Sequence, residues 1–127
     1  MLKAKTKNIK EQKGLAYSIS ASNGSYKDDG IFYISANCIP ANIEKLEKDI
    51  FNEINYIQRY GVTEEELNTA KKMIEQETYY ARESTSNIST ELGYIITLTG
   101  SSDLYNNYID NIKKVTACDV QKAAQKY

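Results

Sequence analysis

Acidic side chains form the two groups in this 127-residue sequence that most resemble a reactive site. Asp28 and Asp29 are adjacent, and three glutamates at positions 64–66 follow Thr63. Clustered carboxylates can bind a metal ion or transfer protons. However, the two aspartates suit a solvated loop tip, and the glutamates suit the first turn of a helix, where the helix dipole favours negative charge. Neither group predicts a site by itself.

Histidine is absent from the sequence. Its absence excludes Ser-His-Asp and Cys-His catalysis, and any metal site that needs imidazole ligands. The two cysteines, Cys38 and Cys118, lie far apart without metal-ligand spacing, so we interpret them as reduced and mostly buried thiols. A disulfide between them stays open, because the sequence does not show its geometry. We expect no metal and no cofactor in this chain.

The composition is that of an ordinary globular protein, with 41% hydrophobic and 26% charged residues. The net charge of −1 predicts neither a nucleic-acid partner nor attraction to an anionic membrane. No apolar run approaches the ~18 residues that cross a bilayer, and no secretory signal is recognisable. The aromatic residues are eleven Tyr, two Phe and no Trp. Tyrosine has an apolar ring and a polar tip, so it suits half-buried positions and contact surfaces.

The first segment predicts the end of a helix joined to a strand. Residues 6–13 are charged and suit the last turns of a helix, and Gly14 suits a left-handed stop. Apolar and small polar residues then alternate over residues 15–22, which is the period of a half-buried strand. This pattern places Lys10 on the helix and Tyr17 on the strand.

A second strand is predicted at residues 31–38, after a polar turn at residues 23–30 that contains two glycines. Both faces of this strand carry apolar side chains, which is typical of an interior strand. A hairpin alone is marginally stable in water. We therefore expect further strands to complete the sheet, either from another chain or from flanking sequence.

About five helices are predicted in the rest of the chain. Pro40 begins the first, Gly61 ends it, and Thr63 with Glu66 forms a capping box for the second. The inward stripe of the first helix is Ile43, Leu46, Ile50, Ile54 and Ile57. Three more helices are expected: one ending near Gly100 with Ile96 inward, one at residues 101–112 and one from Thr116 onward. The sequence therefore predicts an α+β fold, a two-layer sandwich of one sheet and helices, in which residues 1–127 form a single, incomplete domain.

Four segments resemble the pitrilysin/insulinase family of zinc metallopeptidases, specifically its non-catalytic C-terminal domain. They are residues 13–18, 31–36, 61–67 and 115–120, in one order and at familiar distances. The resemblance implies two homologous domains that enclose an unfolded peptide. The other domain bears an inverted His-x-x-Glu-His zinc motif, whose glutamate activates the metal-bound water. Because this chain has no histidine, it matches only the non-catalytic half, should be inactive alone and should pair with a catalytic domain that holds the zinc. Compared with a full domain, it lacks the first strand and helix and the closing strand.

The resemblance also implies two substrate-binding residues. In catalytic members, an arginine and a tyrosine seven residues apart reach the substrate near the scissile carbonyl, and the matching positions are Lys10 and Tyr17. The Tyr17 hydroxyl can donate to the developing oxyanion. Lys10 keeps the positive charge but lacks the bidentate fork of arginine. A core position is the alternative for Tyr17, since the strand pattern places it on one face with Leu15 and Ile19.

The sequence leaves three functions open. The first is a segment of the non-catalytic domain of a zinc metalloendopeptidase, which helps to enclose and position a peptide substrate. Its partners would be that peptide and a catalytic domain on the same or another chain. The second is a structural or assembly subunit related to processing peptidases, which the absence of arginine at Lys10 favours. The third is a small helical adaptor with a Tyr-rich surface, which the unpaired strands argue against. Completion of the sheet by an oligomer stays open.

Overall fold

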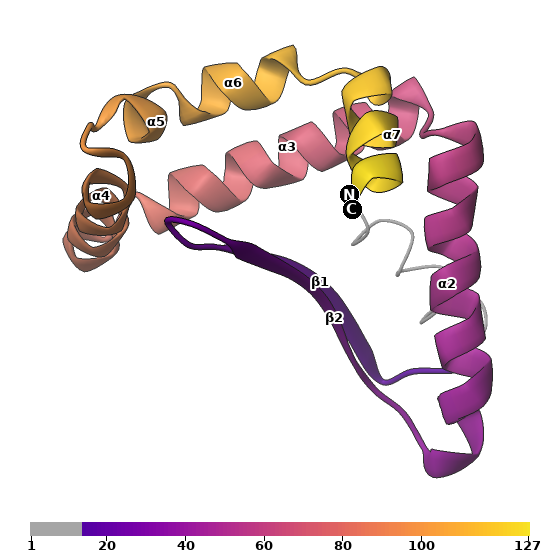
Figure 1. Cartoon of the computed structure of the whole chain (residues 1–127). Coiled ribbons are helices and arrows are strands. Elements are labelled where there is room, and N and C mark those ends of the chain that lie inside the picture. The colour runs from indigo at the N-terminus through magenta and orange to yellow at the C-terminus, as the bar shows by residue number, and fades with distance from the viewer. Residues whose placement is uncertain (1–13) are drawn as a thin grey trace.

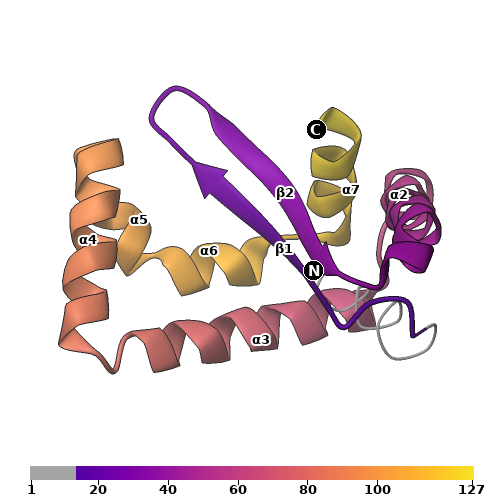
Figure 2. The same cartoon turned by 90° about the horizontal axis from the view of Figure 1, so that it is seen from below.

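The computed structural model describes residues 14–127 as a β-hairpin followed by a run of helices. The elements are β1 (Ser18–Ser25), β2 (Gly30–Asn37), the 3-10 turn η1 (Pro40–Asn42), α2 (Ile43–Tyr60), α3 (Glu64–Ala81), α4 (Thr85–Thr99), α5 (Asp103–Asn106), α6 (Tyr108–Lys114) and α7 (Ala117–Lys126). Helices α2, α3 and α4 form three sides of an open frame, with α6 along α3 and α7 beside α2 (Figures 1 and 2). This architecture confirms the predicted α+β class. The helix predicted at residues 6–13 lies outside the described residues.

The hairpin crosses this frame from the start of α2 toward α4 (Figure 1). Its antiparallel strands pair from Ser18 opposite Asn37 to Ser25 opposite Gly30. At the tip, the Tyr94 hydroxyl of α4 donates a hydrogen bond to the Ser25 carbonyl. This contact links the turn of the hairpin to the far side of the frame.

The boundaries of the strands differ from the predicted ones. β1 begins three residues later than expected, because Leu15 and Ala16 are both buried and cannot belong to an alternating strand. The turn is correspondingly shorter, and the Tyr26 N–H closes it by donating to the Asp29 carbonyl at 2.8 Å. β2 agrees with the expected strand within one residue at each end. Among residues 14–127, β1 is the only strand beside β2, so a fully interior β2 stays a prediction.

The two faces of the hairpin have different surroundings. Ile19 and Ala36 are paired, share one face and pack with the buried residues Leu15, Ala16 and Leu46. The opposite face is exposed and uncharged, and it carries Ser18, Ser20, Ser22, Ile31, Tyr33, Ser35 and Asn37. One face of the hairpin therefore stabilises the start of α2, while the other is an open surface of hydroxyl, amide and apolar groups.

The inward stripe predicted for α2 is partly correct. Leu46 and Ile57 are buried, and Leu46 is only 4% exposed. Ile43 was expected in the same stripe but is 55% exposed, because no described element covers the first residue of α2. Ile96 of α4 is also exposed rather than inward. Helical periodicity identifies the apolar side of a helix but not the length over which a neighbour covers it.

Local signals predicted most helix boundaries, although Pro40 begins the 3-10 turn η1 and α2 itself begins only at Ile43. The Thr63 N–H donates to the Glu66 carboxylate at 2.9 Å, and the Glu66 N–H donates to the Thr63 hydroxyl at 3.2 Å, which confirms the capping box. The single helix expected at residues 101–112 is instead split into α5 and α6 at Asn107. The Asn107 side chain donates to the Asp103 carbonyl at 3.0 Å, a local hydrogen bond that competes with regular helix. None of the helices in residues 14–127 is long and apolar enough to cross a membrane.

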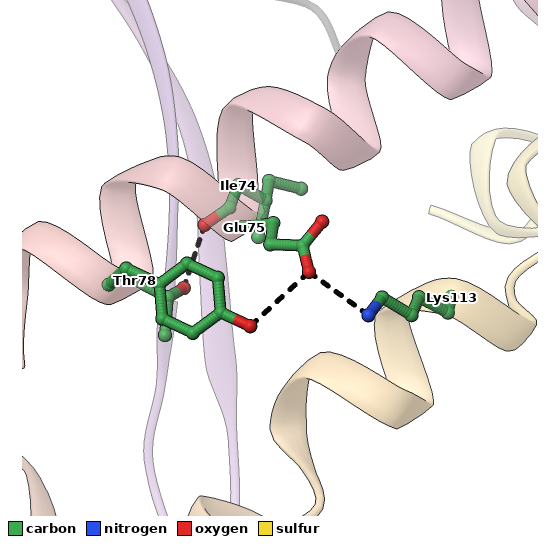
Figure 3. A network of polar contacts seen from close by, with 5 residues as sticks. Ile74, Glu75, Thr78 and Lys113 are labelled. Carbon is green, nitrogen blue, oxygen red and sulfur yellow. Dashed lines mark hydrogen bonds and ion pairs between the residues drawn. The ribbon is translucent and has the colours of Figure 1, made fainter.

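Helix α6 is held along α3 by a set of polar contacts (Figure 3). The Lys113 ammonium lies 3.0 Å from the Glu75 carboxylate, which also accepts a hydrogen bond from the Tyr79 hydroxyl at 3.4 Å. A hydrogen bond and the charge of Glu75 raise the pKa of Lys113. Lys71 donates to the Lys113 carbonyl at 2.8 Å. These contacts are solvent-exposed, so they fix the position of α6 more than they stabilise the fold.

Three glutamines connect α7 to the end of α2. Gln121 donates to the carbonyls of Gln58 and Arg59 at 3.1 and 3.2 Å, and Gln125 donates to the Gln58 carbonyl at 2.8 Å. In return, Gln58 donates to the Ala124 carbonyl at 2.7 Å. Carbonyls in the last turn of a helix have no donor within the helix. The side chains of α7 supply these donors.

The start of α7 gives a prediction for the pH dependence of stability. The Thr116 hydroxyl and N–H donate to the Asp119 carboxylate at 2.7 and 2.9 Å, which lowers the pKa of Asp119 below its ordinary value of 3.8. Because the folded pKa lies below the unfolded one, the stabilisation is present above pH 3.8 and is lost as the pH falls through the folded pKa. We expect Asp119→Asn to be less stable than wild type at neutral pH, and the two to converge in acid. Urea unfolding at a series of pH values measures this, and a pH-independent difference contradicts it.

Candidate functional site

Tyr17 lies directly before β1, and its side chain is 70% exposed. The alternative that Tyr17 is a core residue is therefore wrong for the described part of the chain. The strand pattern failed here because the chain bends at Tyr17, so the alternation does not extend back from Ile19 to Leu15. The hydroxyl of Tyr17 is thus presented to the surroundings rather than packed against Leu15.

The backbone on both sides of Tyr17 is held in place. The Tyr17 N–H donates to the Asn37 carbonyl at 2.8 Å, and the Asn37 amide donates to the Ser18 hydroxyl at 2.8 Å. On the other side, the Asn42 amide donates to the Leu15 carbonyl at 3.3 Å. Leu15 itself is buried. Two hydrogen bonds therefore hold the backbone beside the exposed Tyr17 side chain, and a third holds the side chain of the next residue, Ser18.

A small cavity of about 70 Å³ lies beside this segment. Its walls are Gly14, Leu15, Ala16, Tyr17, Ile39 and Asn42. Gly14 has φ +59°, the left-handed conformation predicted for it, and a side chain there would be strained. A larger hollow of about 610 Å³ lies along the second half of α2, but its described walls all belong to that one helix. The arrangement around Tyr17 is therefore the better candidate site.

The other candidate residues do not gather around Tyr17. Lys10 lies outside the described residues. Asp28 and Asp29 are exposed in the turn of the hairpin, and Glu66 serves the capping box of α3. No three Cys, Asp or Glu side chains within residues 14–127 lie close enough together to hold a metal ion. The carboxylate groups singled out in the sequence thus have structural explanations.

Both cysteines are free thiols. Cys38 is partly buried and packs against the cluster of Leu15, Ala16 and Leu46. Cys118 is exposed, so the expectation that both thiols are mostly buried is wrong for this residue. Its position in the first turn of α7 places it on the side of the helix that no described element covers.

Asn37 and Asn42 are site residues that the sequence did not reveal. Asn42 is the last residue of the turn η1 and directly precedes α2. In the structure its side chain makes no cap bond and instead reaches Leu15, 27 residues upstream. The contact between Asn37 and Ser18 follows from the register of the hairpin, in which these two residues are paired. Nothing in the sequence indicates the contact between Asn42 and Leu15.

Comparisons with known proteins find similar sequences among zinc proteases. An uncharacterized zinc protease of Streptomyces coelicolor is 25% identical over 117 residues, which are 92% of this chain and 26% of that protein. One of Rickettsia felis is 29% identical over 119 residues, 94% of this chain and 29% of that protein. The chain thus spans less than a third of the length of these relatives. The chain is thus similar to one part of proteins that are named zinc proteases.

Solved structures share the fold. A protease from Helicobacter pylori superimposes with a TM-score of 0.81 at 20% identity, covering 94% of this chain and 29% of that one. The periplasmic protease PqqL from Escherichia coli gives a TM-score of 0.70 at 19% identity, and the match covers 94% of this chain and 14% of that one. The sequence profile of the peptidase M16 inactive domain matches residues 6–74. The chain belongs to this family, which confirms the resemblance to the non-catalytic pitrilysin/insulinase domain.

Proposed function

We propose that this chain is a segment of the non-catalytic domain of a zinc metalloendopeptidase, and that it helps to enclose and position an unfolded peptide. Residues 1–127 would form part of a single domain. The observation that carries this proposal is the exposed Tyr17 on a fixed backbone, at the end of an open and uncharged hairpin face, in a member of the inactive-domain family. Hydroxyl and amide groups on that face suit the backbone of an extended peptide.

The chain has no histidine, and no three Cys, Asp or Glu side chains within residues 14–127 lie close enough together to hold zinc. We therefore assign the metal to a partner catalytic domain, on the same polypeptide or on another, as the names of the zinc-protease relatives suggest. The contribution of this chain is positioning and electrostatic. The Tyr17 hydroxyl donates to the oxyanion that develops at the scissile carbonyl, and the resemblance to catalytic members assigns the positive charge of Lys10 to the same substrate.

The open edges of the hairpin support a role within a larger assembly. In the described part of the chain, β1 and β2 pair only with each other. Unpaired backbone donors and acceptors at a sheet edge favour the addition of further strands. We infer that strands of a longer polypeptide, or of an oligomeric partner, complete this sheet. The same argument disfavours an independent helical adaptor.

A structural or assembly subunit without peptidase function is the second candidate. The observation that favours it is Lys10, which stands where the catalytic members have an arginine. Lysine cannot form the bidentate contact with a carbonyl or carboxylate that arginine makes. The two candidates differ in one respect, because only the first brings a peptide into contact with Tyr17.

Photocrosslinking from position 17 tests the proposal. A benzophenone amino acid replaces Tyr17 in the full-length protein that contains this chain, with the catalytic glutamate inactivated, and a fluorescein-labelled unfolded peptide is added. We expect a labelled adduct on irradiation. The matched control carries the same group at Tyr80, which is 73% exposed on α3 and should give little adduct. Absence of an adduct at position 17, or equal adducts at both positions, favours the structural subunit.

A further inference from the structure

We propose that Asn42 is a positioning residue for Tyr17, which it holds in place through the Leu15 carbonyl. This inference rests on the proposed function and adds a residue outside the arginine and tyrosine positions that the family resemblance indicates. Asn42 does not reach Tyr17 itself. It acts on the backbone two residues earlier, where its amide donates to Leu15 at 3.3 Å.

Asn42 links the start of α2 to a distant segment. It is the last residue of the 3-10 turn η1, and its backbone is helical, with φ −100° and ψ −5°. Its side chain makes no hydrogen bond to the first turn of α2, and its amide donates to the Leu15 carbonyl, 27 residues upstream. The donor of Asn42 is therefore used to hold a segment far away in the sequence.

Two peptide planes before the Tyr17 side chain are restrained by different residues. Asn37 fixes the plane between Ala16 and Tyr17, because its carbonyl accepts from the Tyr17 N–H at 2.8 Å. The next plane toward Gly14, between Leu15 and Ala16, is oriented by the hydrogen bond from the Asn42 amide to the Leu15 carbonyl. Burial of Leu15 and Ala16 limits their movement but does not set the orientation of that plane. Asn42 therefore supplies the directional restraint on the side of Gly14.

The segment before Tyr17 needs such a restraint. The segment begins at Gly14, which has φ +59° and is conformationally permissive. The Tyr17 side chain is exposed, so packing within residues 14–127 does not fix it. A catalytic donor that is displaced by about 1 Å can lose about 10²-fold in rate. The hydrogen bond from Asn42 to Leu15, a residue between Gly14 and Tyr17, counteracts this freedom.

The test uses Asn42→Asp in the full-length protein, assayed with a quenched fluorescent peptide that the wild type cleaves. Aspartate has nearly the same shape, and its negative charge is favourable near the start of a helix. It cannot donate to the Leu15 carbonyl. We expect kcat to fall about tenfold with little change in KM, and circular dichroism to show that the variant stays folded. If Asn42 serves only the helix, Asn42→Asp keeps the wild-type kcat, which overturns the proposal.

A double-mutant cycle separates this inference from the proposed function. If Asn42 acts through Tyr17, Asn42→Asp lowers kcat in wild type but causes no further loss in a Tyr17→Phe background. An equal loss in both backgrounds overturns the positioning role while leaving the role of Tyr17 intact. Full activity of Tyr17→Phe overturns the proposed function itself, and the inference with it. Asn55→Asp, on the exposed side of the same helix, is the matched control and should keep the wild-type kcat.

Discussion

Tyr17→Phe in the full-length protein is expected to lower kcat by about 10²–10³-fold, the usual effect of removing one donor to a developing oxyanion. KM should change little, because the hydroxyl interacts more strongly with the transition state than with the bound peptide. Steady-state kinetics with a peptide substrate measure both constants. The fold should not be affected, since the ring of Tyr17 is 70% exposed and remains in the variant.

A matched variant distinguishes this effect from a general loss of tyrosine hydroxyls. Tyr80→Phe removes the same group from an equally exposed position on α3 and should retain wild-type kinetics. If Tyr17→Phe raises KM without changing kcat, Tyr17 binds the peptide uniformly and has no oxyanion role. If neither constant changes, the structural-subunit alternative becomes the better explanation.

Leu46→Ala is expected to have the largest effect on stability, a decrease of about 2–5 kcal/mol in the free energy of unfolding. Leu46 is 4% exposed and joins Leu15 and Ala16 in the cluster between the hairpin and α2. Few apolar side chains of the described residues are buried, so the structure has little other core to compensate for a cavity. Urea unfolding, monitored by tyrosine fluorescence or circular dichroism, measures the loss.

The control for this prediction is Ile43→Ala, one turn earlier on α2. The sequence pattern places Ile43 and Leu46 in the same inward stripe, whereas the structure leaves Ile43 55% exposed. We therefore expect Ile43→Ala to change the stability by no more than about 0.5 kcal/mol. Equal losses from both substitutions contradict the described packing and indicate that another element covers the start of α2 in the full-length protein.

The sequence by itself determined the features that depend on a few neighbouring residues. Gly14 was expected to be left-handed and has φ +59°. Thr63 and Glu66 were expected to form a capping box, and both of its hydrogen bonds are present. These features follow from steric limits and hydrogen bonds within one turn of the chain, which the residue types express directly. Four short sequence segments, which occur in the order and at the spacing typical of the family, were enough to identify it.

Only the tertiary structure decided which side chains are exposed and which distant groups meet. The bend before β1 exposes Tyr17, although the alternating pattern placed it with Leu15 and Ile19. Asn42 reaches Leu15 across 27 residues, a contact that no local pattern predicted. Periodicity reports which side of an element is apolar, but coverage and long-range hydrogen bonds depend on how the elements are placed together. The candidate site is made of such contacts, and for that reason the sequence indicated Tyr17 but not the residues that hold it.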